Sequence, residues 1–311
     1  MKFPILKKAS VYAIELPTVN PIELEQAFEK FAFKVPSESQ VVSMGFASHP
    51  LMQRLVVPLS NGFVFAFKRS EKKIPAAALE NAIAEKAEQE GLSLGELDYW
   101  LQLREEVTPS LIASALADES TIYAFYHNKS QRLIIGSINK KHCNELTAYL
   151  VKALEKVKTQ TVHLDSNTQG ITQRTLNTIE KSNDNWGEFE LGEYIKLTAK
   201  VEKIKQEETF KNVTQEDFAQ RVSKIIIEDN YKVEELSLKK GECNVVLTKD
   251  FSFKSVTFNE VGIIDANSDQ YDNQEDLYIG ESAAKLELLN GFINDLLTLI
   301  GLPEEQEKQA A

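Results

Sequence analysis

Residues 54–69, RLVVPLSNGFVFAFKR, decide the fold class of this chain. The segment FVFAF at 63–67 is apolar at every position, so a strand built from it presents two apolar faces. The preceding pair Asn61-Gly62 is a strong turn signal, because both residue types tolerate a positive φ. The stretch therefore predicts a β-hairpin whose second strand lies in the buried centre of a sheet.

Helices and further strands are predicted on both sides of this hairpin. Asn20 and Asn139 each precede a helical pattern and can cap its first turn, and Pro21 suits a first helical position. Period-2 alternation predicts strands at 10–17, 121–127, 132–138 and 160–165, and a helix is predicted over 139–157. Together these elements predict an α+β unit of mixed sheet and packed helices.

A helical insert interrupts this unit over residues 75–118. Its composition is rich in Ala and Glu, which favour helix, and its 80–106 segment is strongly acidic. Three helices are predicted there: one over 76–90 that ends at Gly91, one after a capping box of Ser93 and Glu96, and one from Thr108-Pro109 through Ala117.

A second α+β unit is predicted after the polar stretch that follows Asn167. Thr214 and Asp217 form a capping box for a helix through Ile227. Strands are predicted at 231–238, 243–249 and 252–258, followed by a terminal helix over about 280–300. The predicted organisation is a central α+β domain (1–74 and 119–166), a helical tip insert (75–118) and a base α+β domain (167–311).

The composition limits the function classes. The 311 residues are 42% hydrophobic and 26% charged, with a net charge of −12, which is typical of a soluble protein with a substantial core. No apolar run is long enough for a membrane span or a signal peptide, so we expect a cytoplasmic location and no membrane partner. Cys143 and Cys243 lie in no metal-ligand spacing, and we expect two reduced, partly buried thiols.

No motif for catalysis or cofactor binding is present. The patterns GxxxxGK[ST], GxGxxG and GxSxG are absent, and the four histidines are scattered. The acidic stretch 265–276 partly fits a calcium loop through Asp265, Asn267, Asp269 and Asp276, but Gln270 stands where the loop needs glycine. We therefore expect a solvated loop there, and neither a metal, a cofactor nor an enzymatic activity.

Positive charge is segregated along the chain. Basic residues gather in 68–73, 140–158, 196–211 and 232–254, whereas acidic residues concentrate in 80–106 and 260–281. Such a distribution allows one basic surface to bind phosphates although the net charge is negative. The alternative is that these lysines solvate surface faces and bind nothing.

Several segments, in this order, resemble the bacterial recombination-associated RdgC family. They are FKRSEKKIP, QRLIIGSINKKHCNELTAYLVKAL, NVTQEDF, YKVEELSLKKGECNVVLTKDFSFKSVTF and ESAAKLELLNGFINDLLTLIGL, and together they span nearly the whole chain. The resemblance implies a horseshoe-shaped subunit with a helical tip and a ring-like homodimer closed by base and tip contacts. It also implies sequence-independent binding of double-stranded DNA in the nucleoid, which limits access of the RecA recombinase to DNA.

The resemblance implies a DNA-binding role for the basic run at 68–73 and for a Lys-Gln pair at 205–206. The charge pattern indicates further lysines as candidates for the same role. The candidate DNA-binding residues are Lys68, Arg69, Lys72, Lys73, Lys203, Lys205, Gln206, Lys211, Lys239 and Lys254. The candidate dimer-interface residues are Tyr99, Trp100, Leu103 and Leu116 in the tip.

The tip departs from the family pattern in two ways. The family's tip is often rich in Lys and Arg, whereas residues 80–106 here are acidic, and Leu116 stands where the family has an aromatic residue. These departures keep a second hypothesis open, in which an acidic protein-interaction module modulates recombination proteins without strong intrinsic DNA binding.

Overall fold

The computed structural model describes residues 6–91, 97–161, 170–181, 185–201, 204–259 and 273–300. The strands of the first half are β1 (Ala9–Glu15), β2 (Val42–Ala47), β3 (Val56–Leu59), β4 (Gly62–Lys72), β5 (Ala117–His127), β6 (Arg132–Ile135) and β7 (Lys158–Thr161). Those of the second half are β8 (Glu190–Val201), β9 (Ile204–Lys211), β10 (Lys232–Lys240), β11 (Cys243–Thr248) and β12 (Ser252–Phe258).

Helices flank these strands in both halves. They are α1 (Pro21–Glu29), α2 (Ala76–Glu90), α3 (Leu97–Ser114), α4 (Lys140–Leu154), α5 (Ile171–Ile179), α6 (Gln215–Asp217), α7 (Ser223–Glu228) and α8 (Gln274–Ile300), with a π-helical segment, Phe218–Val222, between α6 and α7. The predicted α+β class is confirmed. Among the described ranges, no helix is both long enough and apolar enough to cross a membrane.

All the strands belong to one sheet with antiparallel neighbours. The described strands follow the order β2-β4-β5-β6-β1-β12-β11-β10-β8-β9, with β3 also on β4 and β7 also on β1. The two halves meet where β1 pairs with β12, at Ala9 opposite Phe253 and Ser10 opposite Ser252. The sheet therefore continues from the N-terminal half of the chain into its C-terminal half.

Strand β4 is central and buried, as the sequence predicts. It pairs with β2 and β3 on one side and with β5 along its whole length on the other. The turn differs by one residue from the prediction: Leu59 pairs with Gly62, so Ser60 and Asn61 form the loop, and neither has a positive φ. Gly62 is needed instead for close approach, because a Cβ there would lie 1.8 Å from the carbonyl oxygen of Tyr126.

Helices cover both faces of the first half. Helices α1 and α4 bury Leu24, Phe28, Leu146 and Leu150 against one face of the sheet. As predicted, Asn20 accepts a hydrogen bond from the Ile22 amide at 3.0 Å, and Asn139 caps α4 in the same way. Helix α8 covers the opposite face, where it contacts β3 and β5.

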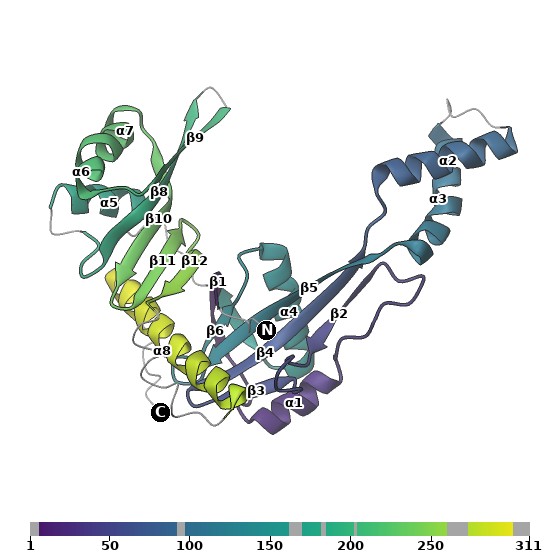
Figure 1. Cartoon of the computed structure of the whole chain (residues 1–311), viewed down its shortest axis with the longest axis horizontal. Helices are drawn as coiled ribbons and strands as arrows, with labels where there is room; N and C mark the ends of the chain where they lie inside the picture. The colour runs from purple at the N-terminus through teal and green to yellow at the C-terminus, as the bar shows by residue number, and fades with distance from the viewer. Residues whose placement is uncertain are drawn as a thin grey trace.

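Helix α8 also reaches the second half of the sheet. Its side chains share one core with Trp186, Leu197 and Phe253, and α5 and α7 add to the same layer. Figure 1 shows α5–α7 on the outer side of β8–β12, away from the arm formed by α2 and α3. The second half of the sheet is thus covered by helices on one face only, among the residues that the structure describes.

The arm consists of α2 and α3, which extend from the far ends of β4 and β5 (Figure 1). Its small core holds Ile83, Ala87, Leu103 and Val107. Helix α2 ends at Gly91, whose φ of 66° is left-handed, as the sequence predicts. The Ser93–Glu96 capping box falls outside the described residues.

The predicted third helix of the insert is wrong. Helix α3 continues through Pro109 to Ser114, and Ala117 already begins β5. Proline removes the backbone donor for the Glu105 carbonyl, and the Thr108 hydroxyl donates to the neighbouring Arg104 carbonyl at 2.6 Å. A proline inside an exposed helix is therefore accommodated without a break.

Several elements predicted for the second α+β unit are present in the structure. The Thr214–Asp217 capping box and the three strands β10, β11 and β12 are confirmed. Helix α8 begins at Gln274, so Asp276 of the calcium-loop pattern lies in a helix, while Asp265, Asn267, Asp269 and Gln270 fall outside the described residues. Strands β2, β8 and β9 had no counterpart among the predicted strands.

Candidate nucleic-acid interface

Lysines gather on the face of β8–β12 that α5–α8 leave uncovered. Along β8, Ile195 and Leu197 are buried in the core, so the alternating Tyr194 and Lys196 point to the opposite face. We call this surface the lysine face, and its members are Lys196 on β8, Lys205 and Lys211 on β9, Lys239 on β10, Lys249 after β11 and Lys254 on β12.

A β-bulge in β10 brings two neighbouring carboxylates to the lysine face. The register with β8 shifts between Val233 and Glu235, so Glu234 is the extra residue on β10. Glu235 is buried and accepts hydrogen bonds from the Tyr194 hydroxyl at 2.6 Å and from Lys254 Nζ at 2.9 Å. Burial and the neighbouring Glu235 raise the pKa of Tyr194, which keeps the phenol protonated.

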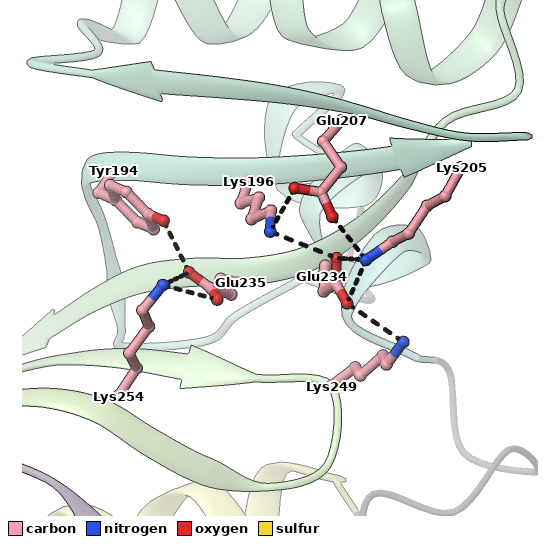
Figure 2. Close-up of polar contacts among 8 residues, drawn as sticks. All are labelled: Tyr194, Lys196, Lys205, Glu207, Glu234, Glu235, Lys249 and Lys254. Atoms are coloured by element: carbon pink, nitrogen blue, oxygen red, sulfur yellow. Dashed lines mark hydrogen bonds and ion pairs between the residues drawn. The ribbon is translucent and has the colours of Figure 1, made fainter. Parts of the chain in front are cut away.

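Glu234 is surrounded by three lysines (Figure 2). Its carboxylate lies 3.1 Å from Lys205 Nζ, 3.4 Å from Lys249 Nζ and 3.9 Å from Lys196 Nζ. Partial burial opposes ionisation of Glu234, but the lysines, Lys205 foremost, hold its pKa below the ordinary value. Glu234 is therefore an anion held by converging cations.

Glu207 on β9 joins the same network. It lies 2.8 Å from Lys196 Nζ and 2.6 Å from Lys205 Nζ (Figure 2), and these contacts, Lys196 first, lower its pKa to about 2. The four lysines and three glutamates of Figure 2 leave one net positive charge. Lys211 adds a charge with no carboxylate partner among the described residues, and Lys239 lies 3.5 Å from Glu193.

The basic run at 68–73 is arranged differently, because strand alternation divides it between two faces of β4. Arg69 is only 8% exposed and lies 2.6 Å from Glu71 and 3.2 Å from Glu145. Its guanidinium lowers the pKa of Glu71 to about 2. Arg69 is thus part of a nearly buried ion cluster within the chain.

The lysines of that run also have partners within the chain. Lys68 Nζ lies 2.8 Å from Glu119 and stacks over the Phe33 ring. Lys72 donates to the carbonyls of Ser37 and Glu38. The exposed Lys73 lies 3.0 Å from Asp118. The run is consecutive in sequence but forms no single basic surface.

The remaining sequence-predicted contacts fall in three places. Lys205, Lys211, Lys239 and Lys254 lie on the lysine face. Gln206, next to Lys205 on β9, points away from it and accepts a hydrogen bond from the Tyr231 hydroxyl at 3.0 Å. Lys203 lies outside the described residues. Lys196 and Lys249 were not among the candidates, although the alternation of residues 194–199 could have placed Lys196 opposite the buried Ile195.

The predicted tip residues differ in exposure. Leu103 is 1% exposed and packs between α2 and α3, so it belongs to the core of the arm. Tyr99 is 40% exposed and Leu116 is 91% exposed, while Trp100 is half-buried beneath the Arg104 guanidinium. Leu101, 44% exposed, is a further apolar surface residue that the sequence did not single out.

Groups suited to metal binding do not assemble in the part of the chain that the structure describes. No cluster of three or more His, Cys, Asp or Glu side chains is placed there to hold an ion. Cys143 and Cys243 are buried free thiols, and burial raises the pKa of Cys243 to about 12. A buried thiol with a raised pKa is a poor nucleophile.

The fold and this surface define the class: a mixed α+β protein with a lysine-rich sheet face that no described helix covers. A family model described as "Putative exonuclease, RdgC" matches residues 5–302. The chain therefore belongs to the RdgC family.

Similar proteins carry a matching name. The chain is 29% identical over 157 residues to Recombination-associated protein RdgC of Shewanella loihica, an alignment covering 48% of this chain and 51% of that protein. It is 27% identical over 157 residues to the protein of the same name from Shewanella halifaxensis, with the same coverage. The aligned region spans about half the length of these curated relatives.

Proposed function

We propose that this protein binds double-stranded DNA without regard to sequence, through the lysine face, and acts in recombination. The observation that carries the proposal is the convergence of six lysines from five neighbouring strands, or the turns that follow them, on one uncovered sheet face. Lysine is a compact point charge suited to phosphates, and phosphate contacts carry no sequence information. The name of the relatives, recombination-associated protein, supports the second half of the proposal.

The assembly that we propose is a ring-like homodimer of horseshoe-shaped subunits around the duplex. Figure 1 shows the α2–α3 arm and the β8–β9 end at opposite extremities of the chain, which offers two separate contact regions. At the arm, Tyr99, Leu101 and Leu116 supply exposed apolar surface for an isologous contact. A duplex held in this way in the nucleoid would be less accessible to the RecA recombinase, and no catalytic step is part of the proposal.

A gel-shift series on unrelated duplexes at increasing salt, with solution mass measured alongside, tests the proposal. We expect similar affinity for every duplex, a steep loss of affinity with salt and the mass of a dimer. The duplexes should remain intact with Mg²⁺ present, because the proposed function is non-enzymatic. A monomer that shifts no duplex at low salt would contradict the proposal, and shortened duplexes would contradict its non-enzymatic part.

A second candidate function is binding of a basic protein partner by the arm. The observation that favours it is the acidic surface of α2 and α3, where Lys86 is already paired with Glu90 and Glu106. Capture of a purified recombination protein in the absence of DNA, with no shift of duplexes, would favour this candidate over the first.

A further inference from the structure

Glu234 stands where a bound phosphate would be expected on a basic surface. Lys196, Lys205 and Lys249 come from three separate segments of the chain, yet their ammonium groups converge on this one carboxylate, at 3.9, 3.1 and 3.4 Å. Figure 2 shows Glu234 between them, with Glu207 bridging Lys196 and Lys205 on one side. Glu234 thus contacts all three cations, whereas Glu207 contacts two of them.

The backbone directs Glu234 to this position. As the extra residue of the β10 bulge, it shares the lysine face with the adjacent Glu235, which regular alternation would prevent. The Glu234 carbonyl also accepts the Lys249 amide at 3.0 Å, so the turn after β11 is attached to the same residue. The carboxylate is therefore anchored, while Lys205 and Lys249 are about half exposed.

The site can exchange one anion for another. The ion pairs of Glu234 with the half-exposed Lys205 and Lys249 contribute little to stability, because water solvates these two ammonium groups. A phosphodiester oxygen accepts the same charge-assisted hydrogen bonds as a carboxylate oxygen. As long as Glu234 holds the three lysines, they have less charge to offer to a nucleic-acid backbone.

We propose that Lys196, Lys205 and Lys249 form a phosphate site and that Glu234 is its built-in competitor, which limits DNA affinity. The proposal rests on the proposed function, because the phosphate it concerns is that of the bound duplex. Its consequence is specific: neutralising Glu234 strengthens binding to any duplex, although no contact with DNA is added.

The test compares Glu234→Gln with Glu208→Gln. Glu208 is exposed on β9, contacts no described lysine and points away from Glu207, so its substitution makes the same change in net charge. We expect Glu234→Gln to bind duplexes about three- to tenfold more tightly than Glu208→Gln. We also expect the slope of log affinity against log salt to steepen by about one, as for one additional neutralised phosphate.

Two further measurements separate charge from folding. Glu234→Asp keeps the negative charge and should bind DNA like the wild type. Without ligand, all variants should have a similar Tm, which would show that the substitutions do not disturb the fold. Tripolyphosphate is a DNA-independent probe of the site. It should raise the Tm of Glu234→Gln more than that of Glu208→Gln.

The outcomes distinguish the two proposals. If the wild type binds duplexes but Glu234→Gln matches Glu208→Gln in affinity and in tripolyphosphate response, the competitor role is overturned and DNA binding stands. If no variant binds duplexes but tripolyphosphate still stabilises Glu234→Gln selectively, the site stands and the DNA function falls. If no variant binds duplexes and tripolyphosphate raises the Tm of Glu234→Gln no more than that of Glu208→Gln, both proposals fall.

Discussion

The basic run at 68–73 and the lysine face have similar composition but different structures. In the run, four cations lie within six residues at the end of one strand, and each is held by groups of the same chain. On the lysine face, cations separated by as many as 58 residues in sequence, from Lys196 to Lys254, lie on one surface. The comparison shows that charge clustering along a strand does not predict charge clustering in space, because neighbours alternate between faces.

Of the substitutions that test this difference between the two regions, Arg69→Met should have the largest effect, and the effect should be on stability. Removing the guanidinium leaves Glu71 and Glu145 near the protein interior without their cation, and we expect the free energy of unfolding to fall by about 2–4 kcal/mol. DNA affinity of the folded protein should not change. Chemical denaturation measures the free energy of unfolding, and gel shifts measure the DNA affinity. If Arg69→Met lost DNA affinity but kept its stability, Arg69 would be a DNA contact and not a structural residue.

The next largest effect should come from the lysine face itself. We expect Lys205→Ala with Lys254→Ala to weaken DNA binding about tenfold and to reduce the salt slope by up to two, because two phosphate contacts are removed. Lys156→Ala with Lys224→Ala removes the same charge outside the lysine face and serves as the control. Equal losses in the two double variants would show that net charge, and not this surface, governs binding.

The fold proved more predictable than the site. Caps such as Asn20 and Thr214 and the strongly alternating β10–β12 follow from local rules, which need no tertiary information. Strand β9 was missed because IKQEETFK is exposed on nearly every residue, so no apolar face marks its period. The role of Glu234 depends on a bulge, and bulges follow from the register of two strands that are distant in sequence.

A smaller effect, dependent on pH, is expected for Glu207→Gln. The pKa of Glu207 is about 2 in the folded protein, below its ordinary value of 4.5, so its contribution to stability is complete above about pH 4.5. That contribution is lost as the pH falls toward 2. Thermal unfolding should therefore show a Tm difference between wild type and variant that is constant from pH 7 to 5 and shrinks below. A difference that grows on acidification would contradict the assigned ion pairs.

The smallest effect is expected for Lys73→Gln at the end of the basic run. Its ion pair with Asp118 lies in solvent, with both side chains more than half exposed, so unfolding free energy should change by less than about 0.5 kcal/mol. DNA affinity should stay within about twofold of the wild type. A tenfold loss measured by gel shift would show that the run contacts DNA even though its other members are paired internally.

Helix α8 joins parts of the chain that are far apart in sequence. The Asn61 side chain at the hairpin turn donates to the Ala283 carbonyl, 222 residues later, and α8 covers the apolar face that holds Val64 and Phe125. Contacts of such long range slow folding and leave partly folded chains with exposed apolar surface. On the ribosome, the first half must therefore keep one apolar face uncovered while the segment between Asn61 and Ala283, which are 222 residues apart, is translated, and that interval is when a chaperone would be most needed.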